Sequence, residues 1–137
     1  MSFKPPQVLL VGHGPAGAGC LLERLHHWGC ECRFASNIEE ARALLGAHAF
    51  DLVLSEFHLE DGTAYPLIAL AQVARTTLFF SQAVEDSCWW LPAVEQGRAC
   101  LGRGAFRPNE FSRVLDELLR EVTTASLQVA SKTASSG

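Results

Sequence analysis

Uninterrupted apolar runs alternate along the chain with stretches in which apolar residues recur every three or four positions. The runs predict strands, because a strand covered on both faces is apolar throughout. They fall at 8–11, 31–35, 51–56, 76–81 and 99–102. The periodic stretches predict helices with one buried face. They fall at 18–28, 38–45, 63–74 and 109–122.

Strand and helix therefore alternate with short connections, which predicts a doubly wound α/β sandwich around a five-stranded parallel sheet. The alternation covers residues 7–122 and predicts one domain there. Residues 123–137 are rich in Ser, Thr and Ala, and we expect them to form a disordered polar tail.

The segment between the fourth and fifth strands contains two adjacent tryptophans, Trp89 and Trp90. A helix is expected here, beginning at 86 or 87 or, with Pro92 in its first turn, at 91. Adjacent residues on a helix cannot both face one core, so one indole is predicted to be exposed. Large exposed aromatic side chains are typical of protein interfaces, which makes this pair a candidate partner surface.

The composition narrows the class of protein. An apolar share of 48% and a charged share of 19% in 137 residues are ordinary for one globular domain. A net charge of −4 offers no electrostatic footprint for nucleic acid or for an anionic membrane. No apolar run reaches the length of a membrane span. The five cysteines lack the spacing of a disulfide framework, which indicates reduced thiols and a cytoplasmic location.

Candidate chemistry lies where the third predicted strand ends. Glu56 closes that strand, and Asp61-Gly62 follows with turn-forming residues. In an open α/β sheet, binding sites gather outside the carboxyl ends of the strands. Glu56 is therefore the first candidate site residue.

The stretch 51–62, an apolar run followed by a carboxylate and a loop that ends in Gly, resembles the third strand of response regulator receiver domains. The resemblance covers about residues 7–122 and implies a flavodoxin-like (βα)5 sandwich in a two-component signalling protein. Receivers hold Mg²⁺ with acidic residues after strand one and with the acceptor aspartate. They also carry a hydroxyl after strand four and a lysine after strand five.

The chain departs from this pattern at most of the functional positions. Gly12 and His13 replace the acidic pair, and Glu56 stands at the acceptor position. Ser81 matches the hydroxyl, while the lysine position falls on Arg103 or, without a gap, on Gly104. Loss of two carboxylates weakens a Mg²⁺ site, and the longer Glu side chain disturbs in-line attack. Glu56 is expected to be either a fixed charge paired with Arg103 or a solvated carboxylate.

The first loop offers a rival interpretation. Gly12, Gly14 and Gly17 satisfy G-x-G-x-x-G between a strand and a helix, the context of dinucleotide binding. Glycines there let backbone N–H groups approach a phosphate. No acidic residue follows at about 20 residues to bind a ribose. A small nucleotide- or anion-binding sensor domain is the alternative function.

These features together predict a degenerate receiver that is not an enzyme and uses no cofactor and no metal ion. We expect it to act through a protein partner and not through nucleic acid or a membrane. Receivers commonly dimerise through helix four, strand five and helix five, so the resemblance implies a homodimer or partner contact near Trp89 and Trp90.

Overall fold

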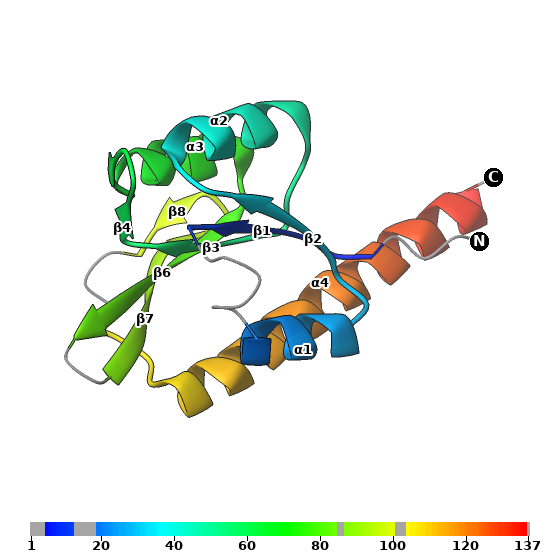
Figure 1. The fold of residues 1–137 in the computed structure, drawn as a ribbon. Helices are drawn as coiled ribbons and strands as arrows, with labels where there is room; N and C mark the ends of the chain where they lie inside the picture. Colours follow the sequence, from blue (N-terminus) through cyan, green and yellow to red (C-terminus); the bar gives the residue numbers. More distant parts are fainter. Residues whose placement is uncertain (1–4, 13–18, 85–86, 101–103, 137) are drawn as a thin grey trace.

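A central sheet with helices on both faces organises the chain (Figure 1). The computed structural model describes residues 5–12, 19–84, 87–100 and 104–136. Within them the main sheet has the strand order β2-β1-β3-β6-β7-β8. The strands are β1 (Gln7–Val11), β2 (Glu31–Ala35), β3 (Leu52–Glu56), β6 (Thr77–Val84), β7 (Ser87–Glu95) and β8 (Arg98–Ala99). The short strands β4 (His58–Leu59) and β5 (Gly62–Thr63) form a separate hairpin.

Two helical layers enclose the sheet, which confirms the predicted α/β sandwich. Helices α2 (Ile38–Ala47) and α3 (Pro66–Ala74) cover one face, and α1 (Gly19–His27) and α4 (Pro108–Ser136) cover the other (Figure 1). Successive residues of β1 serve the two layers in turn. Leu9 and Val11 join the core under α2 and α3, while Val8 and Leu10 join the core under α1 and α4. All four are fully buried, which explains the continuous apolar run.

The last part of the sheet differs from the predicted parallel order. Strands β2, β1, β3 and β6 are parallel, but β7 runs antiparallel to β6 and β8 runs antiparallel to β7. The prediction of a helix beginning at 86, 87 or 91 is therefore wrong, because this segment forms the strand β7. Pro92 lacks an N–H and lies opposite Phe79, beside the register shift that follows Leu78. A bulge of this kind accommodates proline in a strand, whereas a helix interior does not.

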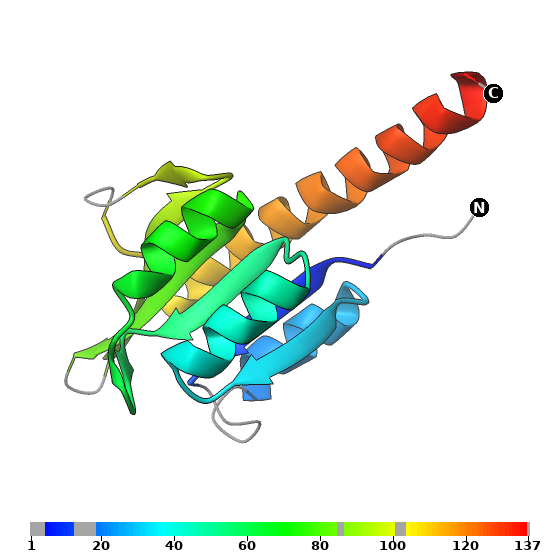
Figure 2. The same ribbon diagram turned by 90° about the horizontal axis from the view of Figure 1, so that it is seen from above.

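The carboxyl-terminal elements also depart from the sequence prediction. The fifth strand, predicted at 99–102, is the two-residue strand β8, and residues 101–103 lie outside the described part. Helix α4 continues to Ser136 instead of ending at 122, and its end extends past the sheet (Figure 2). Neither Gly nor Pro occurs between 109 and 136, so the backbone meets no helix breaker there. In the described part of the chain, no helix has the length and apolar character needed to cross a membrane.

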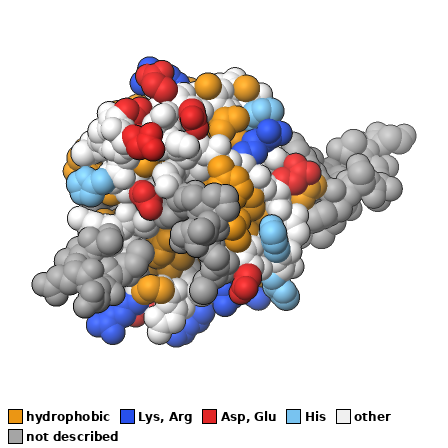
Figure 3. All heavy atoms as spheres, viewed as in Figure 1, with side chains coloured by type: hydrophobic (Ala, Val, Ile, Leu, Met, Phe, Trp, Pro, Cys, Tyr) orange, Lys and Arg blue, Asp and Glu red, His pale blue; other side chains and the backbone are white. Residues whose placement is uncertain are grey.

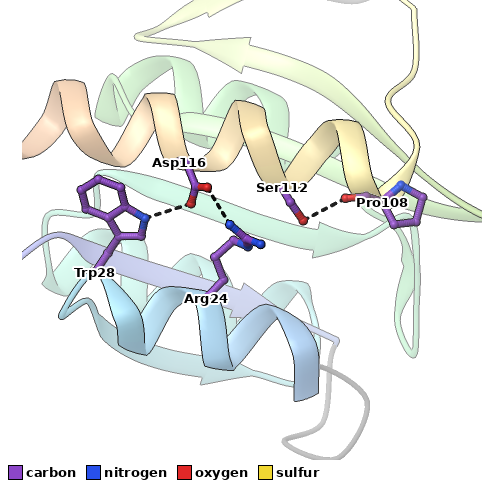
Figure 4. A network of polar contacts seen from close by, with 5 residues as sticks. All are labelled: Arg24, Trp28, Pro108, Ser112 and Asp116. Carbon is purple, nitrogen blue, oxygen red and sulfur yellow. Dashed lines mark hydrogen bonds and ion pairs between the residues drawn. The ribbon is translucent and has the colours of Figure 1, made fainter.

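A polar contact joins α1 and the residue after it to α4, beside the core that these helices cover (Figure 4). Arg24 Nη1 donates to Asp116 Oδ2 at 2.6 Å, and the Trp28 indole Nε1 donates to Asp116 Oδ1 at 2.9 Å. Desolvation raises the pKa of Asp116, but the hydrogen bonds from Trp28 and Arg24 and the Arg24 charge outweigh it. The pKa of Asp116 is therefore lowered.

Asp116→Ala should lower the free energy of unfolding at pH 7 by about 1 kcal/mol, because both donors lose a charged acceptor. The contribution exists where Asp116 is ionised in both states, above its unfolded pKa of about 3.9. It disappears as the pH falls through the lowered folded pKa. Urea unfolding at several pH values measures this loss. The neighbouring exposed Glu117→Ala is the control, and an equal effect of the two variants would contradict the role of the contact.

Two adjacent threonines at the start of β6 differ in their hydrogen bonding. Both are buried, with Thr76 1% and Thr77 5% exposed. Among the described residues the Thr76 hydroxyl has no partner, whereas Thr77 Oγ1 accepts from the Gln96 N–H at 3.4 Å. Burial of an unpaired hydroxyl opposes folding.

Thr76→Val should therefore raise the free energy of unfolding by about 1 kcal/mol, since valine has the same shape without the hydroxyl. Thr77→Val is the matched control and should lower it by about 0.5–1 kcal/mol through loss of the bond from Gln96. Chemical denaturation of both variants measures whether each change raises or lowers the free energy of unfolding. Destabilisation by Thr76→Val would show that its hydroxyl is satisfied in solution.

Candidate functional site

Glu56, the last residue of β3, lies beside Ser81, which lies within the neighbouring parallel strand β6. They are register partners on β3 and β6, and the Phe57 N–H donates to the Ser81 carbonyl oxygen at 3.1 Å. Ser81 is buried and Glu56 is partly buried. Desolvation raises the pKa of the Glu56 carboxyl above its ordinary value. Partial burial of this carboxyl therefore disfavours its charged form.

Gly12 directly follows β1, the other strand that pairs with β3, and lies next to Glu56. Its φ of +83° is in the region that favours glycine, and its N–H donates to the Ala35 carbonyl oxygen at 2.7 Å. A Cβ at this position would lie 2.6 Å from Leu59 Cδ2 and 3.0 Å from Glu56 Oε2. No side chain can therefore extend from position 12 without displacing Leu59.

The β4–β5 hairpin carries Leu59 to this place, and Asp61 ties the hairpin to α2. One Asp61 oxygen accepts from the Ile38 N–H at 3.0 Å, and the other accepts from the Glu39 N–H at 3.3 Å. These N–H groups belong to the first turn of α2, where backbone donors lack helical partners. Asp61 therefore positions the hairpin, a role beyond the turn that the sequence predicts. Its Asp-Gly pair indicates a hairpin but not the distant helix that it contacts.

Comparison with solved structures identifies the fold. The chain matches the non-phosphorylated HemR receiver domain from Leptospira biflexa with a TM-score of 0.54 and 23% identity, over 83% of this chain and 94% of that domain. It also matches the anti-anti-sigma factor PhyR from Bartonella quintana with a TM-score of 0.51 and 16% identity, over 96% of this chain and 52% of PhyR. The chain has the receiver-domain fold.

Other matches are partial. The chain spans less than two thirds of a two-component response regulator from Clostridium difficile, with 63% of that chain covered at 22% identity and a TM-score of 0.49. No protein-family model matches the sequence, and the search of curated proteins gave no match.

The receiver fold implies a Mg²⁺ site at this end of the sheet, and the described residues do not suit one. Mg²⁺ prefers several oxygen ligands in octahedral geometry. Position 12 is a glycine under an apolar side chain, and the Asp61 oxygens accept bonds from α2. Within the described ranges, no group of three His, Cys, Asp or Glu residues could hold a metal ion.

Several predicted site residues lie outside the described part of the chain, namely His13, Gly14, Gly17 and Arg103. The ion pair between Glu56 and Arg103 stays a prediction. Gly104 is described, with a φ of +89°, and follows the segment 101–103. The Gly12 N–H already donates to Ala35, so it is not available to a phosphate in the alternative sensor function.

The predicted tryptophan surface is a strand and not a helix. Trp90 is 7% exposed and stacks on Phe111 of α4, with ring centroids 4.4 Å apart. Trp89 is partly buried on the opposite face of β7, and the Arg107 guanidinium lies 5.5 Å from its ring centroid. One indole is thus buried, because successive residues of a strand face opposite sides. The receiver dimer face expected here needs a fourth helix, and β7 stands in its place.

Proposed function

We propose that residues 7–122 form a receiver-like signalling domain that acts through protein–protein contacts, without Mg²⁺-dependent phosphorylation of Glu56. The geometry of Gly12 is the observation that carries this proposal. The position at which a receiver places an acidic metal ligand has a positive φ, and Leu59 and Glu56 lie where its side chain would go. An acidic residue there would require both a strained backbone and a shift of Leu59.

The state of Glu56 supports the same proposal. Its pKa is raised by desolvation, so partial burial disfavours the ionised carboxylate, which is the form that would attack a phosphoryl group. Phosphoryl transfer depends on metal ions and positive charge that neutralise the transferred group. Because the described residues form no group that could hold Mg²⁺, we assign the output of the domain to binding and not to phosphotransfer.

A protein partner follows as the route of signalling. PhyR, which shares the fold, is named an anti-anti-sigma factor, and this supports a domain that works on other proteins. The partly buried Trp89 with Arg107 above its ring is the candidate partner surface, since Trp and Arg are frequent at binding hot spots. The free thiols of Cys30, Cys32 and Cys100 support a cytoplasmic location.

Titration with Mg²⁺ and beryllofluoride, a mimic of a bound phosphoryl group, tests the proposal. We expect no saturable change in tryptophan fluorescence or in the amide shifts of Glu56 and Ser81. Matched titrations with Mg²⁺ and fluoride alone control for nonspecific ionic effects. A saturable, Mg²⁺-dependent shift confined to these residues would overturn the proposal and establish a working phosphoryl switch.

A further inference from the structure

The outer edge of β2 carries backbone groups that no other strand of the described part of the chain pairs with. β2 is the first strand of the sheet and, within the described part of the chain, pairs with β1 alone. The Glu31 N–H donates to the Pro6 carbonyl oxygen at 2.9 Å, and the Ala35 carbonyl oxygen accepts from Gly12 at 2.7 Å. Glu31 and Ala35 thus direct their backbone groups toward β1. By alternation, Cys32 and Phe34 direct theirs outward, where they can pair with another strand.

The two faces of β2 have different chemistry. Ala35 belongs to the core under α2, so Glu31 and Arg33 share that face, and both are exposed. Cys32 packs against the core under α1, so Phe34 lies on that second face. Phe34 is 41% exposed, unusually open for a phenylalanine. Figure 3 views the molecule onto this edge and shows apolar side chains gathered in a strip down its middle.

Natural edge strands are protected by prolines, bulges, inward charges or short length, and also by charged side chains, which in β2 are one Glu and one Arg of opposite sign that can pair with a second copy. β2 has none of the first three, and its five residues pair with β1 in unbroken register. A regular edge beside an exposed phenylalanine favours strand addition.

We propose that β2 pairs antiparallel with β2 of a second copy of this chain, about a two-fold axis through Cys32. In this register Cys32 lies opposite its own counterpart. Glu31 lies opposite Arg33 of the second copy, and Arg33 lies opposite Glu31, which forms two unlike-charge pairs on one face. On the other face Phe34 lies opposite Cys30. Cross-strand pairs of these kinds are the units that stabilise a sheet.

The register follows from charge and from hydrogen bonding. A two-fold axis perpendicular to the sheet places each residue opposite one from the same face. An axis through Arg33 would set two arginines opposite each other, and an axis through Glu31 would set two glutamates opposite each other. An axis through Phe34 leaves both charges without a partner. The Cys32 axis alone pairs unlike charges, and it joins the outward backbone groups of Cys32 in a hydrogen-bonded pair.

Charge reversal tests the pairing by sedimentation of the full chain over a range of concentrations. We expect the wild type to dimerise, and Arg33→Glu and Glu31→Arg each to weaken dimerisation by roughly tenfold, because each sets like charges opposite. An equimolar mixture of the two variants should regain the dimer, since Glu–Arg pairs form again between unlike chains. Arg42→Glu, an exposed charge reversal on α2, is the control and should leave dimerisation unchanged.

Oxidative crosslinking tests the axis itself. Opposite residues in a hydrogen-bonded antiparallel pair have Cα atoms about 5.5 Å apart, within the range of a disulfide. Because burial raises the pKa of the Cys32 thiol, oxidation is carried out at alkaline pH, where it should yield a covalent dimer that Cys32→Ser abolishes and Cys30→Ser retains. The proposal is overturned if the wild type stays monomeric at all concentrations, or if the mixed variants fail to regain the dimer. Loss of the crosslink with Cys30→Ser instead of Cys32→Ser would also reject this register. Circular dichroism establishes that each variant is folded.

Discussion

Gly12→Ala should lower the free energy of unfolding by about 2–3 kcal/mol. A positive φ costs an alanine about 1–2 kcal/mol. The new Cβ would also lie 2.6 Å from Leu59 Cδ2 and 3.0 Å from the Glu56 carboxylate, and moving the ends of these two side chains aside adds about 1 kcal/mol. Chemical denaturation followed by circular dichroism measures the loss.

Two other glycines separate the cost of the positive φ from the cost of the steric contacts. Gly29 has a φ of +71° but nothing within 4 Å of its missing Cβ, so Gly29→Ala should cost the backbone term alone, about 1 kcal/mol. Gly46 lies inside α2 with open space around it and no positive φ. Gly46→Ala should therefore stabilise the domain by about 0.5–1 kcal/mol through helix propensity.

The order of the three unfolding free energies shows whether position 12 has room for a side chain. If Gly12→Ala costs no more than Gly29→Ala, then Leu59 moves aside freely and position 12 has room for a side chain. In that case an acidic residue at position 12 would be sterically possible, and the main support for a metal-free receiver would be lost. If the predicted order holds, restoring the metal ligand with Gly12→Asp carries a folding cost before any ligand can bind.

The parallel half of the fold was predictable because its signals are local. The runs at 8–11 and 51–56 are apolar throughout, and such runs require a sheet covered on both faces. The helix predicted at 63–74 is present as α3, although it begins at Pro66 and Thr63 belongs to β5. These patterns depend on neighbours in sequence and not on distant contacts.

The antiparallel part was not predictable in the same way. The segment around Trp89 and Trp90 has no alternation that distinguishes strand from helix, and Pro92 was placed at a helix start. Its strand state depends on pairing with β6, where the register shift after Leu78 accommodates the proline. Propensity is a weak guide where tertiary pairing decides the outcome.

The placement of Gly12, Glu56 and Ser81 near one another was predictable, but the side chains that surround them were not. Strand order brings Gly12, Glu56 and Ser81 to one end of the sheet, as the resemblance implied. Nothing in the sequence places Leu59 over Gly12, because that contact needs the β4–β5 hairpin and its anchor. The anchor, Asp61, accepts from the Ile38 N–H, 23 residues away in the chain. Long-range capping of this kind leaves no periodic signal.

Trp90→Ala should lower the free energy of unfolding by about 4 kcal/mol, near the upper range for a core substitution. The indole is 7% exposed and stacks on Phe111 with rings 10° from parallel, so its loss opens a cavity between β7 and α4. Trp89→Ala is the matched control. It should cost about 1 kcal/mol, because Trp89 is less buried and its contact with Arg107 lies near the surface.

This pair of variants also tests the strand assignment, since a strand places neighbouring side chains in opposite environments. A double-mutant cycle of Trp90→Phe with Phe111→Leu should give a coupling energy of about 1 kcal/mol from the stacked rings, and both variants keep the core filled enough to fold. Denaturation with guanidinium, followed by fluorescence and circular dichroism, measures each corner. Equal costs at positions 89 and 90, or no coupling between Trp90 and Phe111, would contradict a strand that anchors α4 to the sheet. A large cost at Trp90 alone would locate the stability of this region in the β7–α4 contact, which leaves Trp89 free for partner binding.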